Sequence, residues 1–86
     1  MAVGTMRYWA AAKEAAGTPE EPYDAATLAE ALREARERHA ESVRFAAVVA
    51  NCSFVVDGDP VGRRDHAGIE LTEGGTVEVL PPFAGG

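Results

Sequence analysis

Polar and apolar positions alternate near both ends of the chain, and this alternation predicts two half-buried strands. In segment 3–9, Arg7 prefers water, so residues of its parity face outward and the others inward: Thr5, Arg7 and Trp9 outside, Gly4, Met6 and Tyr8 inside. In segment 76–80, Glu78 sets the parity in the same way: Thr76, Glu78 and Leu80 outside, Val77 and Val79 inside. Each predicted strand therefore presents one face to a core.

Helical spacing appears in two places. Segment 10–16 is rich in alanine and stops at Gly17, which suits the left-handed residue that ends a helix. A longer helix is predicted from 28 to 40, because Thr27 and Glu30 form a capping box. Its apolar face holds Leu28, Ala31, Leu32, Ala35 and His39.

The middle of the chain alternates between strand and turn signals. Two prolines in 18–25 predict a short edge strand. Segment 45–56 is apolar and rich in β-branched residues around Asn51, which predicts two short strands or one bent strand. The turn Asp57-Gly58-Asp59-Pro60 follows, and 61–75 is predicted as a loop anchored by Ile69 and Leu71. We expect an α+β domain, a mixed sheet with one long helix packed on one face.

Length and charge narrow the class of protein. With 86 residues the chain has room for one domain, and its net charge of −6 disfavours nucleic acid as a partner. A partner with a basic surface suits this field better. The apolar runs are too short to span a bilayer and no secretion signal is visible, so we expect a cytoplasmic protein that does not enter a membrane.

The C-terminal segment is the most informative stretch of the sequence. Residues 1–80 are expected to form the domain, and 81–86 a flexible tail that ends in Gly-Gly. Pro81 and Pro82 would stiffen the base of this tail. Two terminal glycines are no wider than a backbone, so the tail could thread a narrow channel and present its carboxylate to another protein's active site. Six extended residues reach at most about 20 Å.

The whole chain resembles the small subunits of molybdopterin synthase, which are ubiquitin-like sulfur carriers of the β-grasp fold. The resemblance rests on the run Arg7–Gly17, the Thr-Leu-x-Glu-Ala-Leu pattern from Thr27, Ala50-Asn51, and above all the end from Gly75 to Gly86. Two departures are visible. Gly74-Gly75 stands where the family often has Gly-Asp, and the loop 57–72 is long.

The resemblance implies a chemistry centred on Gly86. A ubiquitin-activating-type adenylyltransferase, using ATP and Mg²⁺, would convert the terminal carboxylate to an acyl-adenylate. Sulfur from a sulfur donor enzyme would then replace AMP and leave a thiocarboxylate. The large synthase subunit would take in the tail, Pro81, Pro82, Phe83, Ala84 and Gly85 included, and pass the sulfur to a cyclic pterin precursor. The chain itself would bind no cofactor or metal.

A carrier of this kind must dock on several partners. Trp9 and Leu80 are expected on the solvent face of the sheet, and the resemblance adds Phe54. We therefore expect these three residues to form a docking patch. The alternative is that the loop 57–72 covers this face.

Other reactive residues have simpler interpretations. Cys52 lacks a nearby cation in sequence and suits a small buried apolar role. His39 and His66 match neither a nucleophile motif nor metal-ligand spacing. Arg63-Arg64 could bind a phosphate or an acidic partner, or simply lie in a solvated loop.

Three other functions remain open at this point. The chain could be a carrier for thiamine or cysteine synthesis, or a ubiquitin-like modifier joined through Gly86 to lysines. It could also be a plain interaction domain with an inert tail.

Overall fold

The computed structural model describes residues 1–82, in which strands and helices alternate along the chain. In order they are β1 (Ala2–Tyr8), α1 (Ala10–Ala16), β2 (Glu20–Ala25), α2 (Leu28–Arg38), α3 (Val43–Ala50), β3 (Ser53–Val56), β4 (Asp59–Pro60), the short 3-10 helix η1 (His66–Gly68) and β5 (Thr76–Leu80).

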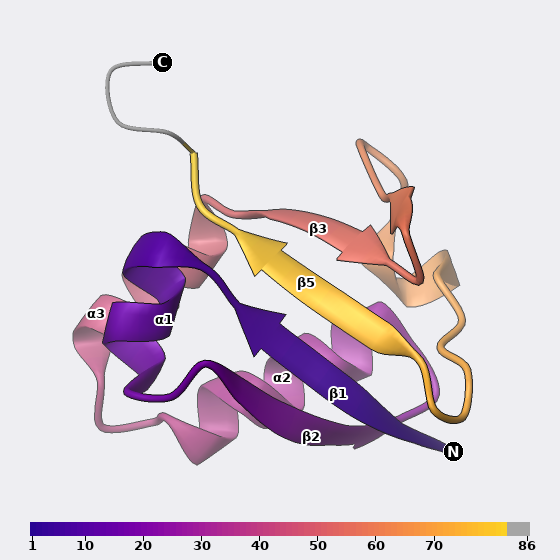
Figure 1. Cartoon of the computed structure of the whole chain (residues 1–86), viewed down its shortest axis with the longest axis horizontal. Helices are drawn as coiled ribbons and strands as arrows, with labels where there is room; N and C mark the ends of the chain where they lie inside the picture. The colour runs from indigo at the N-terminus through magenta and orange to yellow at the C-terminus, as the bar shows by residue number, and fades with distance from the viewer. Residues whose placement is uncertain (83–86) are drawn as a thin grey trace.

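The strands form one mixed sheet in the order β2-β1-β5-β3-β4 (Figure 1). β1 and β5 run parallel, whereas the β1–β2, β3–β5 and β3–β4 pairs are antiparallel. The proline-containing β2 lies at an edge, as predicted, because proline has no backbone N–H to donate to a neighbouring strand. β5 therefore lies inside the sheet, although it is the last element of the chain.

The alternation predicted for β1 and β5 is confirmed. Met6 and Tyr8 are 1% exposed, and Val77 and Val79 are fully buried. Arg7, by contrast, lies on the other face with an exposed side chain. These buried residues join the helices in a single apolar core.

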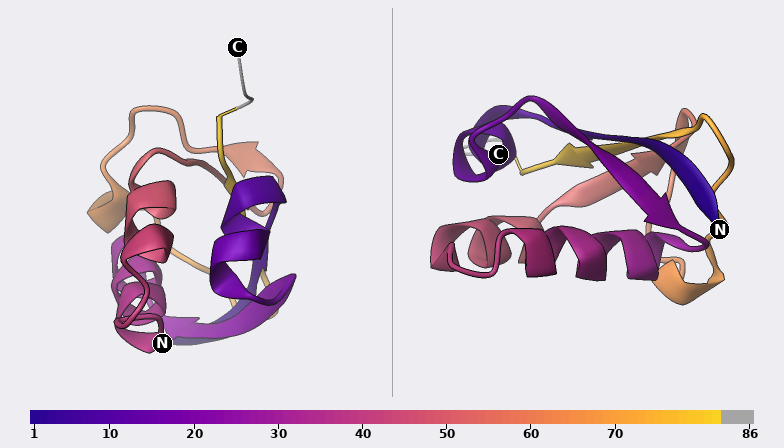
Figure 2. Two further views of the ribbon diagram at one scale, coloured as in Figure 1. Left: turned by 90° about the vertical axis from the view of Figure 1, so that its left-hand side faces the viewer. Right: turned by 90° about the horizontal axis from the view of Figure 1, so that it is seen from below.

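α2 and α3 pack on one face of this sheet, as Figure 2 shows, and α1 lies at one end of the sheet in contact with α3. The predicted capping of α2 is present, because Glu30 donates its backbone N–H to Thr27 Oγ1 at 3.3 Å and its carboxylate accepts from the Ala26 N–H at 3.0 Å. The predicted apolar face is buried: Leu28, Ala31, Leu32 and Ala35. The α+β architecture is confirmed.

One prediction about the middle of the chain is wrong. Residues 43–50 form α3, not a strand. Ser42 caps this helix by accepting the Phe45 N–H at 3.0 Å. Phe45 and Val49, four residues apart, are its buried positions. The valines misled the pattern because they are common in strands, while the cap and the spacing of these two residues fit a helix.

The turn predicted at 57–60 joins β3 to β4. Asp57 and Gly58 both have positive φ, 50° and 82°, as a tight hairpin turn requires. Arg64 holds the strand that follows, donating to the Pro60 carbonyl at 2.7 Å and to Asp59 at 3.1 Å. Arg64, one residue of the Arg63-Arg64 pair, therefore has a structural role.

The start of β5 is crowded. Asp57 accepts the Thr76 N–H at 2.8 Å and the Thr72 hydroxyl at 2.8 Å. Tyr23 donates its hydroxyl to the Thr72 carbonyl at 2.8 Å. The Gly75 carbonyl accepts from Thr5 at 3.0 Å, which continues the contact with β1. These bonds fix where the central strand begins.

Candidate functional site

The far end of β5 is the root of the predicted tail. There Val79 pairs with Tyr8 on one side and Phe54 on the other, and Leu80 pairs with Ser53. Pro81 and Pro82 follow, and neither can donate a backbone hydrogen bond, so the ladder ends. The tail residues Phe83, Ala84, Gly85 and Gly86 lie outside the described residues.

Trp9 lies beside this root. Its backbone N–H donates to the Val79 carbonyl at 3.2 Å, and its indole Nε1–H donates to Glu78 Oε1 at 3.2 Å. The side chain is nevertheless 43% exposed. Trp9 is also the N-cap residue of α1, and Ala10 after it has a φ of 49°, which turns the chain sharply out of the sheet. The indole is thus oriented by a hydrogen bond and open to solvent.

Leu80 is half-buried on the same side of the sheet as Glu78, as the parity of β5 predicts. The loop 57–72 does not take the covering role considered above, since it packs along α2: Leu28 donates to the Ile69 carbonyl, and Leu71 donates to the Ala26 carbonyl, each at 2.9 Å. Leu80 lies on the face opposite that of the buried Val77 and Val79, and Figure 2 shows α2 and α3 on one side of the sheet only.

The expectation that Phe54 belongs to this patch is wrong. Its side chain is 6% exposed and forms part of the core, with its ring edge-on to His66 at 5.2 Å between centroids. Phe54 pairs with the buried Val79, and paired residues of a ladder point to the same face. Ser53 takes the position beside Leu80 instead.

A polar network ties the sheet to the end of α2. Glu21 on β2 accepts from the Tyr8 hydroxyl at 2.7 Å, lies 2.9 Å from His39 Nε2, and accepts from Arg38 at 3.2 Å. Burial alone would raise the pKa of Glu21, but hydrogen bonds from His39, Tyr8 and Arg38 hold it below its usual value. Burial, reinforced by this carboxylate, raises the pKa of Tyr8 well above the ordinary range.

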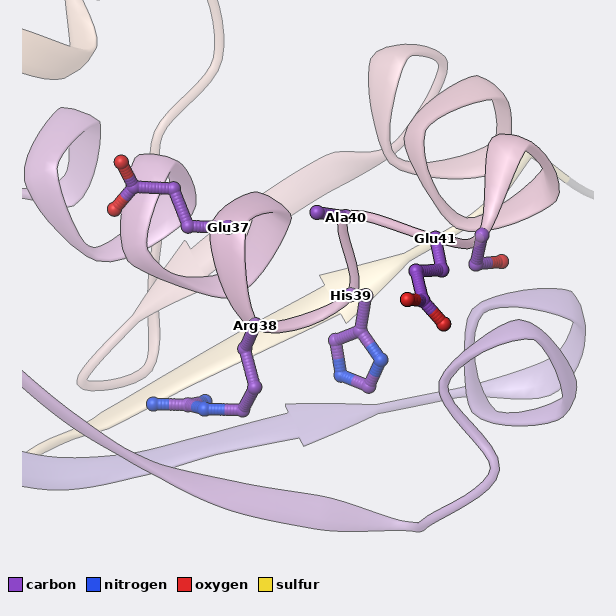
Figure 3. A pocket seen from close by; sticks show the side chains of 6 residues that line it. Glu37, Arg38, His39, Ala40 and Glu41 are labelled. Atoms are coloured by element: carbon purple, nitrogen blue, oxygen red, sulfur yellow. The ribbon is translucent and has the colours of Figure 1, made fainter.

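His39 has a packing role in this network. Its ring stacks on Phe45 at 4.2 Å between centroids. Figure 3 shows the surface hollow of about 500 Å³ at this turn, lined by residues 37–42, with His39 and Arg38 pointing down toward the sheet. The hollow lies at the junction of α2 and α3, and Pro81 and Pro82 are not among its lining residues.

Cys52 has an environment that fits the small, buried apolar role predicted from the sequence. It is partly buried against the core, and its thiol lies 3.2 Å from the Val48 carbonyl. Burial raises the pKa of this thiol, which disfavours the nucleophilic thiolate.

Across residues 1–82, no group of three or more His, Cys, Asp or Glu side chains is arranged to hold a metal ion. Within the same span, no helix has the length and hydrophobicity needed to cross a bilayer.

The architecture defines a class: a mixed sheet with its last strand inside, α2 and α3 on one face, and an exposed aromatic residue beside the end of that last strand. This is the ubiquitin-like β-grasp class to which the sulfur carriers belong. The sequence matches the ThiS family over residues 6–86, and the chain belongs to that family. A comparison with curated proteins gives no significant sequence match.

Solved structures show the same fold. Small archaeal modifier protein 1 from Methanosarcina acetivorans is 20% identical, with a TM-score of 0.83 over 100% of this chain and 98% of that one. A putative molybdopterin converting factor subunit 1 from Pyrococcus furiosus is 23% identical, with a TM-score of 0.76 over 96% and 100%.

A third neighbour was solved as a complex. It is a complex of subunits 1 and 2 of the molybdopterin-converting factor from Helicobacter pylori. The matching chain is 20% identical, with a TM-score of 0.68 over 98% of this chain and 99% of that one. These similarities concern the fold.

Proposed function

We propose that this ThiS-family protein carries sulfur as a thiocarboxylate on Gly86 and donates it for molybdopterin synthesis. One observation supports this most: a central strand, fixed at its start, leads through Pro81 and Pro82 into a sequence that ends in Gly-Gly. The family match extends to Gly86 itself. From Pro82, four extended residues reach about 13 Å, enough to bring a carboxylate into a partner's active site.

The chemistry runs in three steps. A carboxylate resists substitution because the leaving group would be oxide, so a ubiquitin-activating-type enzyme first forms the acyl-adenylate of Gly86 from ATP, releasing pyrophosphate. A persulfide sulfur from the donor enzyme then attacks the carbonyl carbon and AMP leaves. Reduction of the resulting acyl disulfide by a second thiol frees the thiocarboxylate. ATP and Mg²⁺ are used by the activating enzyme, and this chain supplies the acyl group.

The acceptor is the large subunit of a molybdopterin synthase, with the exposed Trp9 and the half-buried Leu80 as the docking contact. The Helicobacter pylori complex is of subunits 1 and 2, and its matching chain shares the fold described here. In the proposed complex the tail enters the large subunit, and its thiocarboxylate sulfur attacks the pterin precursor. Two such transfers supply the two sulfurs of the dithiolene.

A second candidate is a ubiquitin-like modifier. The similarity to small archaeal modifier protein 1 favours a modifier, because that structure has the highest TM-score of the three described above. The first step would be the same adenylation, and a lysine amine would then replace AMP. A carrier for thiamine synthesis is a further variant of the same chemistry.

Reconstitution tests the proposal. The chain is incubated with ATP, its host's activating enzyme and a persulfide donor, and then with the large subunit and the cyclic pterin precursor. The proposal predicts dithiolene product with wild type and none with a variant carrying one extra alanine after Gly86. Thiocarboxylate without product would reject the molybdopterin acceptor, and protein adducts in place of thiocarboxylate would favour the modifier.

A further inference from the structure

A groove of about 300 Å³ lies at the tail root, on the helical side of the molecule. α1 contributes one wall and α3 the other, and the two prolines of the tail root complete the lining. Its residues are Ala11 of α1, then Arg44, Ala47, Val48 and Asn51 of α3, then Pro81 and Pro82. The groove thus joins three segments that are far apart in sequence.

The lining is mostly apolar, with two polar groups. Asn51 donates its side-chain N–H to the Ala47 carbonyl at 3.2 Å, which holds it at the end of α3. Arg44 lies 3.3 Å from Glu14 of α1, with the two side chains 62% and 71% exposed. An ion pair this exposed contributes little to stability, so the Arg44 guanidinium can exchange Glu14 for another carboxylate.

We propose that this groove receives an aliphatic side chain, flanked by a carboxylate, from the protein that accepts the tail. The inference rests on the proposed function. It follows from continuity: Pro81 and Pro82 are at once part of the groove and the first residues of the tail. A protein that takes in residues 83–86 must contact the exposed Pro82, and its surface then lies beside Ala47 and Val48.

The groove complements the contact at Trp9. Trp9 and Leu80 belong to the outer face of the sheet by the parity of their strands, and the groove lies between α1 and α3. A partner that contacts both surfaces holds the tail root from two sides. These two contacts together would fix the direction in which the tail enters the partner's active site. The reacting atom of Gly86 would then reach a reproducible position there.

Two neighbouring alanines give a matched test. Ala46 and Ala47 are both exposed on α3, but only Ala47 lines the groove. Ala47→Trp fills the groove, whereas Ala46→Trp adds the same side chain outside it. The dissociation constant of the full chain for the large synthase subunit, measured by titration calorimetry, should rise about tenfold or more for Ala47→Trp. It should change less than about twofold for Ala46→Trp.

If Ala47→Trp fails to fold, a variant that reverses a charge in the groove tests the same contact. Arg44→Glu should weaken binding by about fivefold to tenfold, while Glu14→Gln, which frees Arg44, should leave it unchanged or stronger. Equal dissociation constants for the wild type, Ala47→Trp and Arg44→Glu would overturn the groove contact. Thiocarboxylate formation on the same variants should stay intact.

Two further outcomes are decisive. If the wild type itself does not bind the large subunit, the proposed acceptor is wrong and the groove contact falls with it. If deleting residues 83–86 from the free chain shifts the backbone amide NMR signals of Ala47, Val48 and Asn51, the chain's own tail occupies the groove and the proposal is overturned. We expect these signals to shift only when the large subunit is added.

Discussion

The same dipeptide, Gly-Gly, occurs just before β5 and again at the end of the sequence. The first pair has a structural role, and the second pair has a proposed chemical role. Gly74 has a φ of 75°, which disfavours other residues. A Cβ on Gly75 would lie 2.5 Å from Thr72 Oγ1 and 2.6 Å from Asp57 Oδ1, so a side chain there would displace both groups. Gly74 is therefore required by its backbone angle and Gly75 by packing.

The outer pair, Gly85-Gly86, lies outside the described residues. Its proposed role is chemical: a narrow end that bears the reacting carboxylate. β5 thus lies between two glycine pairs, one with a structural role and one with a proposed functional role. The inner pair fixes where β5 begins, and under the proposed function the outer pair is what the end of β5 presents to a partner.

The largest effect is expected from the inner pair. The double variant Gly74→Ala, Gly75→Ala should lose about 3 to 4 kcal/mol of unfolding free energy, from a left-handed alanine and from crowding against Thr72 and Asp57. Urea denaturation measures this loss. Gly17→Ala is the control for φ alone, since its φ is also 75° and a Cβ there meets nothing within 4 Å. Equal losses in both variants would refute the packing argument.

The outer pair should show the opposite behaviour. Gly85→Ala, Gly86→Ala should reduce sulfur transfer by about 100-fold, or about 2.7 kcal/mol in activation free energy, because the added methyl groups misplace the carboxylate. The unfolding free energy should stay within about 0.5 kcal/mol of wild type. Single-turnover transfer and urea denaturation measure the two quantities. Unchanged transfer would remove the distinction between the pairs.

A smaller effect is expected at the docking face. Trp9→Ala with Leu80→Ala should weaken binding to the large subunit by about 10-fold to 30-fold, since exposed aromatic residues often carry binding energy. Val3→Ala is the control, because Val3 is another exposed apolar residue of the sheet, 47% exposed, at the other end of β1. Calorimetric titration reports both. Affinity equal to wild type in the double variant would reject the patch.

The smallest effect concerns Glu21. Its pKa is lowered in the fold from the ordinary 4.5, so its contribution to stability is present above that value and is lost as pH falls through the folded pKa. Glu21→Gln should therefore cost about 1 kcal/mol at neutral pH and progressively less in acid. The exposed Glu20→Gln is the control. A difference between Glu21→Gln and wild type that stays constant with pH would contradict the linkage.

Local signals predicted much of this molecule. The parity of Arg7 and Glu78 gave the buried faces of β1 and β5, and the capping box at Thr27 gave the start of α2. Each of these depends on neighbours in sequence, which is why it could be read without a structure. The position of Trp9 follows from the same parity.

Tertiary context decided the rest. Residues 43–50 form α3 although three of the eight are valines, and the three alanines, the Ser42 cap and the spacing of Phe45 and Val49 indicate the helix. Phe54 was misplaced because its side depends on its pairing with Val79, which no local pattern encodes. The contact of His39 with Glu21, 18 positions apart, depends in the same way on how the sheet packs against α2.

The central claim is that Gly86 carries sulfur, and intact mass spectrometry tests it most directly. The chain is incubated with ATP, a sulfur donor and its host's activating enzyme, beside a chain that lacks Gly86. We predict a mass gain equal to the exchange of one oxygen for sulfur, absent from the shortened chain. An unchanged mass, with an activating enzyme that is active on another carrier, would contradict the account.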